Sequence, residues 1–174
     1  MKRILASISI LSFVLAVTVL FAQAAEPDKL SRKDMKFVHE AAIGGMLQVQ
    51  LGQMVKDKAQ SQDVKDFGAR MVTDHTGVNT ELKQLADKKG VTLPDKLDAK
   101  HEKIVDKLSK LSGADFDKEY MKVMVKGHEN DVAAFKKASK DLKDPDLKDF
   151  AAKTLPAYEE HLKMAKETAA KLGK

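Results

Sequence analysis

The chain has 174 residues, of which 43% are hydrophobic, 33% are charged and only 5% are aromatic, and it contains neither Cys nor Trp. The absence of Cys excludes disulfides, thiolate zinc sites and iron–sulfur clusters, and the length and composition exclude a disordered, collagen-like or multi-domain chain. The formal net charge is +5, but Lys residues are interspersed with Asp and Glu along the whole chain, so a nucleic-acid-binding arm is not expected.

The N-terminus has the pattern of an export signal. Lys2 and Arg3 precede nineteen uncharged residues, and Ala22, Gln23 and Ala24 place small residues where a signal peptidase cleaves. The pattern predicts a signal peptide over residues 1–24 and a periplasmic or secreted mature protein. The alternative is an uncleaved anchor, since nineteen uncharged residues can just span a bilayer; membrane contact is expected only through this segment.

Two long helices are predicted next, joined by a very short connection. Ser31 followed by Asp34 has the spacing of a capping box, and the helix that begins there extends to about residue 58. Ser61 is predicted to cap a second helix that runs to Lys89 and stops at Gly90. Because so few residues separate these two helices, they must form an antiparallel hairpin.

A shorter helix and a second hairpin complete the pattern. The third long helix is predicted from about residue 115 to 142, and Asp144 with Pro145 starts a fourth that ends near residue 172. Pro156 lies inside this last helix and is expected to bend it rather than end it. The shorter helix before them carries apolar positions at steps of three and four residues, namely Leu97, His101, Ile104, Leu108 and Leu111.

The predicted fold is all-α: a ferritin-like four-helix bundle over residues 31–172, built from two antiparallel hairpins and a short crossover helix. The crossover of about 24 residues is long enough to span the bundle. It therefore predicts that the second and third long helices run parallel, whereas an ordinary up-down-up-down bundle would make them antiparallel.

Several short motifs stand out along the chain: Ala41–Met46, Leu51-Gly52, Val64–Gly68, Met71–His75, Leu93-Pro94, Leu108–Gly113, Met124-Val125 with His128, and Leu155-Pro156 with His161-Leu162. Together they resemble the ferritin-like family of exported bacterial proteins known as domain of unknown function 4142. The resemblance extends from about Ser31 to Leu172 and implies a ferritin-like bundle in an exported protein, without an established activity. The family usually has glutamate where this chain has Gln48 and Gln50, and an acidic residue where it has Gly127, so a carboxylate-rich metal site is less expected here.

Three histidines fall on apolar faces of three different long helices: His75, His128 and His161. Counting residues from the helix ends places them, together with Gln48, within about one helical turn of the same level if the second and third helices are parallel. We therefore expect the three imidazoles to meet in the core, with Gln48, Tyr158 and Asp74 nearby. His39 and His101 are expected outside this group.

Two interpretations of the histidines stay open. They form either a hydrogen-bonded polar layer or a mononuclear site for a transition metal such as Zn, Cu or Fe. A ferritin-type di-iron centre is not expected, because Val72, Val125 and Tyr158 stand where its Glu-x-x-His motif needs glutamate. The methionines fall at core spacing and predict packing rather than copper ligation.

The sequence leaves open whether the protein is an enzyme and favours a non-enzymatic role, since it contains no phosphate-binding loop and no nucleophile elbow. The first functional hypothesis is a non-enzymatic exported module. It would either bind an unidentified ligand or protein partner or take part in a stress response. The second is a metal-binding or redox protein that uses the core histidines. Metal content and oligomeric state are not predicted by any pattern in the chain.

Overall fold

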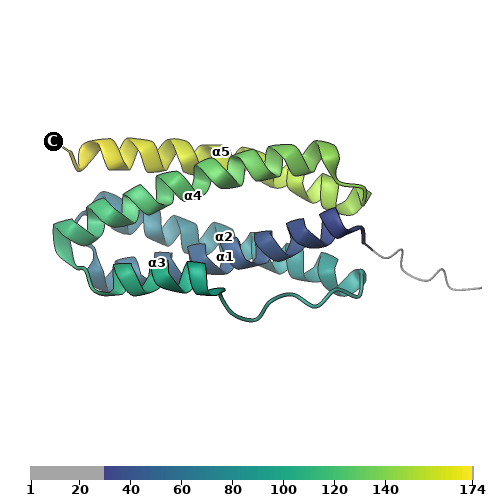
Figure 1. Cartoon of the computed structure of the whole chain (residues 1–174). Helices are drawn as coiled ribbons and strands as arrows, with labels where there is room; N and C mark the ends of the chain where they lie inside the picture. Colours follow the sequence, from purple (N-terminus) through teal and green to yellow (C-terminus); the bar gives the residue numbers. More distant parts are fainter. Residues whose placement is uncertain (1–29, 174) are drawn as a thin grey trace, which may run out of the picture.

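The computed structural model describes residues 30–173, and over that range all of its regular secondary structure is α-helix (Figure 1). The predicted signal peptide and its cleavage site lie outside the described residues. The all-α prediction is confirmed, with four long helices and one short one. The helices are α1 (Arg32–Lys58), α2 (Gln62–Lys88), α3 (Ala99–Ser109), α4 (Gly113–Asp141) and α5 (Pro145–Lys171).

Two of the predicted helix starts are confirmed in detail. Ser31 and Asp34 form a capping box at α1, and Asp144 accepts a hydrogen bond from the backbone N–H of Leu147 at the start of α5. The buried carboxylate of Asp34 also accepts a hydrogen bond of 2.9 Å from the backbone N–H of Lys143. One side chain therefore stabilises the start of α1 and holds the α4–α5 turn against it.

The start of α2 differs from the prediction. Ser61 occupies the N-cap position, but its side chain makes no capping hydrogen bond. Instead Asp117 of α4, which is buried, accepts hydrogen bonds from the backbone N–H groups of Gln60 at 3.2 Å and Ser61 at 2.7 Å. A carboxylate from another helix thus accepts hydrogen bonds from two backbone N–H groups of the α1–α2 turn.

The order of the helices in space follows the two-hairpin plan. Besides the hairpins α1–α2 and α4–α5, α1 lies against α4 and α2 lies against α5 (Figure 1). Both of these pairs are antiparallel: Lys33 near the start of α1 contacts Asp141 at the end of α4, and Asp63 at the start of α2 pairs with Lys171 at the end of α5. Consequently α2 and α4 run parallel, as the crossover length predicted.

The crossover helix α3 packs alongside α1 and α4. It is shorter than predicted, since Leu97 and Leu111 lie outside it although both still pack against the core. Lys58 of α1 donates to the carbonyl of Ser109 at 2.6 Å, which holds the end of α3 in place. In α5 the helix continues through Pro156.

The interior consists of two hydrophobic clusters, one toward each end of the bundle. One contains Met71 of α2 and Met124 of α4, and the other contains Leu82 of α2 and Phe135 of α4. The three histidines belong to neither cluster and fall between them along α2, α4 and α5. A polar layer therefore divides an otherwise apolar core.

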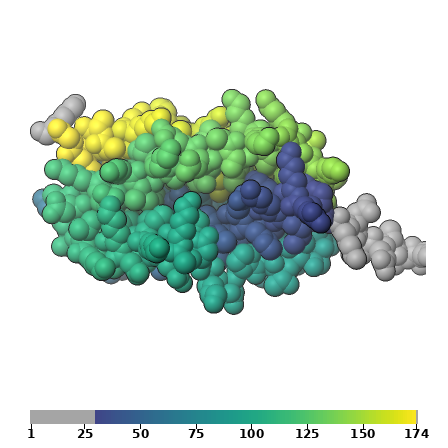
Figure 2. All heavy atoms as spheres, in the orientation of Figure 1, coloured from purple at the N-terminus to yellow at the C-terminus, as the bar shows by residue number. Residues whose placement is uncertain are grey.

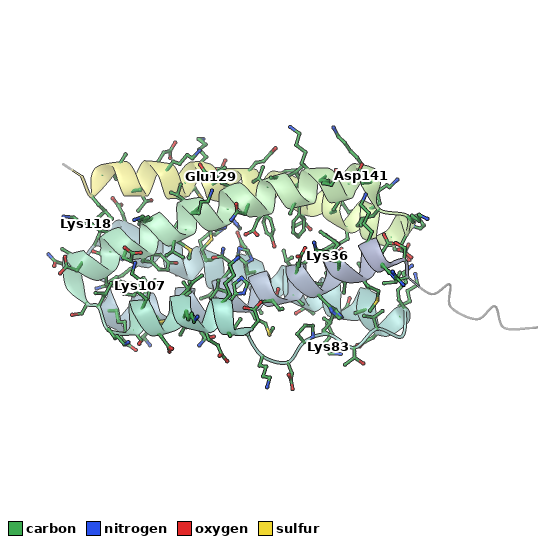
Figure 3. All side chains as sticks on the ribbon, viewed as in Figure 1. Lys36, Lys83, Lys107, Lys118, Glu129 and Asp141 are labelled. Atoms are coloured by element: carbon green, nitrogen blue, oxygen red, sulfur yellow. The ribbon has the colours of Figure 1, made fainter. Side chains whose placement is uncertain are left out.

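Charged side chains cover the outside of the bundle, as the labelled residues in Figure 3 show. Many pair across helices, such as Lys107 of α3 with Glu119 of α4 at 2.6 Å and Lys166 of α5 with Glu129 of α4 at 3.2 Å. None of the helices within residues 30–173 carries a stretch long and apolar enough to cross a membrane.

Candidate metal centre

His75 of α2, His128 of α4 and His161 of α5 meet in the middle of the bundle. Each is at most 1% exposed. One ring nitrogen from each residue lies within 4.8 Å of the corresponding atoms of the other two. The ring centroids are 5.7 Å apart for His75 and His128, and His161 is 5.4 Å from each of the other two. These three side chains are called the histidine cluster below.

Helical periodicity places the histidines there. His75 follows Met71 by four residues and His128 follows Met124 by four, and both methionines are fully buried. His161 lies three residues after the buried Tyr158 on α5. Because α5 runs antiparallel to α2 and α2 runs parallel to α4, these positions reach the same level of the bundle.

In each histidine one ring nitrogen has a polar neighbour outside the cluster. His128 Nδ1 donates to the backbone carbonyl of Met124 at 2.9 Å, and His161 Nε2 donates to the carboxylate of Asp74 at 2.9 Å. His75 Nδ1 lies 3.5 Å from the hydroxyl of Tyr158. Two of the three predicted neighbours, Asp74 and Tyr158, thus contact the cluster directly.

The other nitrogen of each ring has no hydrogen-bond partner among the described residues: His75 Nε2, His128 Nε2 and His161 Nδ1. A carbonyl or carboxylate oxygen only accepts hydrogen bonds, so the nitrogens facing Met124 and Asp74 must carry the ring protons when the rings are neutral. The unpartnered nitrogens of His128 and His161 therefore carry free lone pairs. Buried lone pairs without donors are uncommon in folded proteins and call for an explanation.

Burial keeps the histidines neutral. Burial, together with the neighbouring His128 and His161, lowers the pKa of His75 to about 3 against the opposing charge of Asp74. Burial lowers the pKa of His128 to about 4 despite the hydrogen bond to the Met124 carbonyl. It also lowers the pKa of His161, against the hydrogen bond and the charge of Asp74. Neutral imidazoles are the form that binds metal ions.

Asp74 connects the cluster to the surface. Burial alone would raise its pKa, but hydrogen bonds from Arg70 and His161 outweigh that effect and lower it. Arg70 lies one helical turn before Asp74 and pairs with it. Arg70 thus keeps the Asp74 carboxylate ionised, and this carboxylate holds the His161 imidazole in one orientation. Carboxylates orient histidine ligands in the same way in metal sites.

Gln48, the third predicted neighbour, does not hydrogen-bond to a histidine. Its amide is buried on α1 and donates to the carboxylate of Asp131 on α4, while its carbonyl oxygen has no partner among residues 30–173. Burial raises the pKa of Asp131 to about 6, although the hydrogen bond from Gln48 and the nearby His101 lower it. Sequence reasoning overlooked Asp131, for which the only signal was its position three residues after His128.

His39 and His101 lie outside the histidine cluster, as predicted, and so does the nearby polar residue Asn79 of α2. Asn79 packs against Gly45 of α1, where a larger residue would collide with it. His39 is half-buried on α1, and His101 on α3 contacts Asp98 at 2.7 Å. Within the described part of the chain, the histidine cluster is the one group of three His, Asp or Glu side chains with ligand atoms close enough to share an ion.

The sequence matches the family model described as "Domain of unknown function (DUF4142)" over residues 20–168. The chain belongs to this family. The resemblance found in its motifs is thereby confirmed. No curated protein matches the sequence significantly.

Solved structures with the same fold come from proteins of low sequence identity. A DUF305 fragment from Deinococcus radiodurans is 12% identical with a TM-score of 0.73, over 82% of this chain and 99% of that one. A DUF305 protein from Streptomyces coelicolor, described as secreted, is 15% identical with a TM-score of 0.68, over 81% and 94%. CopM in its Cu(II)-bound form is 15% identical with a TM-score of 0.67, over 79% and 96%. These similarities establish a shared fold.

Proposed function

We propose that this protein binds one transition-metal ion at His75, His128 and His161. The observation that supports the proposal is that each buried ring has one nitrogen without a partner, while the other nitrogen faces a polar group outside the cluster. This is the arrangement in which imidazole ligands are oriented for a metal ion by their surroundings. The proposal develops the metal-binding hypothesis without a catalytic step.

The distances fit an ion after a small contraction. Imidazole nitrogens bound to one ion at about 2.0–2.1 Å lie about 3.4–3.6 Å from one another. The ligand atoms of the cluster lie within 4.8 Å, so the rings would have to approach by about an ångström. Side chains on three separate helices can make that adjustment through small rotations of their rings.

The donor set restricts the ion to one chemical class. Imidazole nitrogens suit Zn²⁺, Cu²⁺, Ni²⁺ and Fe²⁺, whereas Mg²⁺ and Ca²⁺ prefer oxygen ligands. The copper-bound and silver-bound forms of CopM show that a protein of this fold carries such ions. That similarity is at the level of the fold, and the ligands proposed here are this chain's own.

We further propose that the protein acts outside the cytoplasm. Support comes from the signal-peptide pattern of residues 1–24 and from the secreted description of the Streptomyces coelicolor neighbour. Intact-mass measurement of the exported protein tests this. A mass that begins at Ala25 is expected, and a full-length mass in the membrane fraction would identify the segment as an anchor.

Thermal unfolding with Zn²⁺, Cu²⁺ and Ni²⁺ tests the metal proposal. An ion at about 100 times its dissociation constant stabilises the folded state by about 2.7 kcal/mol, which raises the melting temperature of a domain this size by about 5–10 °C. His75→Ala and His128→Ala should lose this increase. His39→Ala, which removes a histidine outside the cluster, should keep it.

The outcomes separate three explanations. Equal stabilisation of the wild type and all variants would indicate surface binding and contradict the proposal. No stabilisation of the wild type, together with strong destabilisation of His75→Ala and His128→Ala, would leave the cluster as a polar layer. The hydrogen bonds to Met124 and Asp74 are the observations that favour that second interpretation.

A further inference from the structure

The histidine cluster is closed to solvent, so an ion must reach it along a path that the folded structure provides. A groove of about 670 Å³ opens between α1, α3 and α4, on the face shown in Figure 2. Its lining includes three residues of α4 near His128. Met124 lies four residues before His128, Gly127 lies one residue before it, and Asp131 lies three residues after it. The groove therefore adjoins the stretch of α4 that carries His128.

Gln48 lies where α1 meets that stretch of α4. It lines the groove but is only 3% exposed, and its carbonyl oxygen has no hydrogen-bond partner among the described residues. A Cβ at Gly127 would lie 3.3 Å from the Gln48 amide nitrogen, so the missing side chain of Gly127 leaves room for the amide to move. A free, buried amide oxygen is a ligand that a passing cation can use.

Asp131 supplies the negative charge at the same place. Its carboxylate accepts the hydrogen bond from Gln48, and burial together with the charge of Asp131 raises the pKa of the Tyr158 hydroxyl. The Tyr158 hydroxyl lies 3.5 Å from His75 Nδ1. Asp131 thus lines the groove about one helical turn from His128 on α4.

From this juxtaposition we propose that Asp131 and Gln48 form a transit site for the transition-metal ion, through which it passes from the groove to the histidine cluster. The inference rests on the proposed function and adds the route. The Asp131 carboxylate replaces part of the ion's hydration shell as the ion leaves solvent. The Gln48 carbonyl oxygen then binds the ion as it moves inward. Because the site stabilises the ion in passage, it governs the rates of binding and release more than the final affinity.

Tyrosine fluorescence provides the readout. The chain has two Tyr and no Trp, and the ring of Tyr158 lies 5.1 Å from that of His75, so Cu²⁺ in the cluster should quench its emission. Stopped-flow mixing of the purified protein with Cu²⁺ measures binding, and an excess of chelator measures release. Asp131→Asn should slow both rates about tenfold and change the dissociation constant less than about threefold.

A second variant and two matched controls keep the test independent of folding defects. Gly127→Ala restricts the Gln48 amide without altering charge and should also slow both rates. Gly77→Ala adds the same methyl group on α2, where nothing lies within 4 Å, and should not slow them. Asp149→Asn removes an exposed carboxylate from α5, which does not line the groove, and controls for general electrostatic attraction.

The possible results distinguish failure of the transit site from failure of metal binding. Unchanged rates in both Asp131→Asn and Gly127→Ala would overturn the transit site while leaving metal binding intact. Faster release with weaker binding in Asp131→Asn would also overturn it, because Asp131 would then be a ligand of the bound ion. Absence of site-specific quenching in the wild type would instead contradict the proposed function itself.

Discussion

At the scale of single residues, the histidine cluster owes its chemistry to what surrounds each ring. Carbonyl and carboxylate oxygens fix the protons of His128 and His161 on the nitrogens that face away from the cluster. Burial then prevents the rings from taking a second proton. The cluster therefore presents lone pairs at neutral pH, when most exposed carboxylates and amines are charged.

This neutrality predicts a loss of stability in mild acid. Below pH 6.5 the unfolded chain protonates His75 and His128, whereas the folded chain, with pKa values of about 3 and about 4, does not. Each histidine then lowers the free energy of unfolding by about 2 kcal/mol between pH 7 and pH 5. Asp131 has the opposite effect, because its pKa is raised to about 6 in the folded chain. Between pH 7 and pH 5 its protonation raises the free energy of unfolding by about 1.4 kcal/mol.

Urea unfolding of the metal-free protein at pH 7 and pH 5 checks this balance. The expected net loss is about 2.6 kcal/mol in the wild type, and about 0.6 kcal/mol in His75→Leu, which removes one of the protonation sites. If the two proteins lost the same free energy, His75 would not be held neutral by the fold.

Asp74 is expected to act on the metal through His161 rather than by binding it. Asp74→Asn keeps a hydrogen-bond acceptor for His161 Nε2 but removes the charge, so we expect the affinity for Zn²⁺ to fall about 10- to 100-fold. Competition with a chromophoric chelator measures this. Asp87→Asn is the matched control, because Asp87 also lies on α2 one turn after a basic partner, Lys83, and is exposed.

At the scale of the helices, a carboxylate of α4 holds the turn that precedes α2. Asp117→Ala leaves the backbone N–H groups of Gln60 and Ser61 without their acceptor and should lower the free energy of unfolding by about 2–3 kcal/mol. Ser61→Ala should change it by less than about 0.5 kcal/mol, because the hydroxyl makes no capping bond. Chemical denaturation measures both changes. If Ser61→Ala lowered the free energy of unfolding more than Asp117→Ala, the Ser61 hydroxyl would be the cap of α2 and the expectation would be wrong.

The helices themselves could be predicted because their signals are local. Capping residues and apolar steps of three and four residues lie within one or two turns of each other, so Ser31, Asp144 and the stripes through Met71 and Met124 could be interpreted without a partner helix. The role of Asp117 could not be predicted in this way, since it depends on which side chain of α4 faces the α1–α2 turn.

At the scale of the whole molecule, the histidine cluster could be predicted because helices are rigid rods with a fixed rise per residue. Counting from helix ends in a two-hairpin bundle brings His75, His128 and His161 to one level. The same counting placed Gln48 at that level but could not show that its amide turns toward Asp131. Rotation of a helix about its axis decides such contacts, and the packing of all four helices sets that rotation.

The two-hairpin order also explains why the polar layer lies at mid-height. Hydrophobic clusters close the bundle on both sides of the histidines, so water is excluded while three helices still hold the rings. A relationship to ferritins as such stays a prediction, and the carboxylate-poor cluster would in any case use different ligands from a di-iron centre.

X-ray absorption spectroscopy of the protein loaded with one equivalent of Zn²⁺ identifies the ligands of the ion itself. It therefore tests whether the histidine cluster binds the metal. A site formed by His75, His128 and His161 should give three imidazole nitrogens at about 2.0 Å, with the multiple-scattering signature of histidine rings, and this signature should be lost in His128→Ala. A shell of oxygen atoms without imidazole scattering, or a spectrum unchanged in His128→Ala, would contradict it.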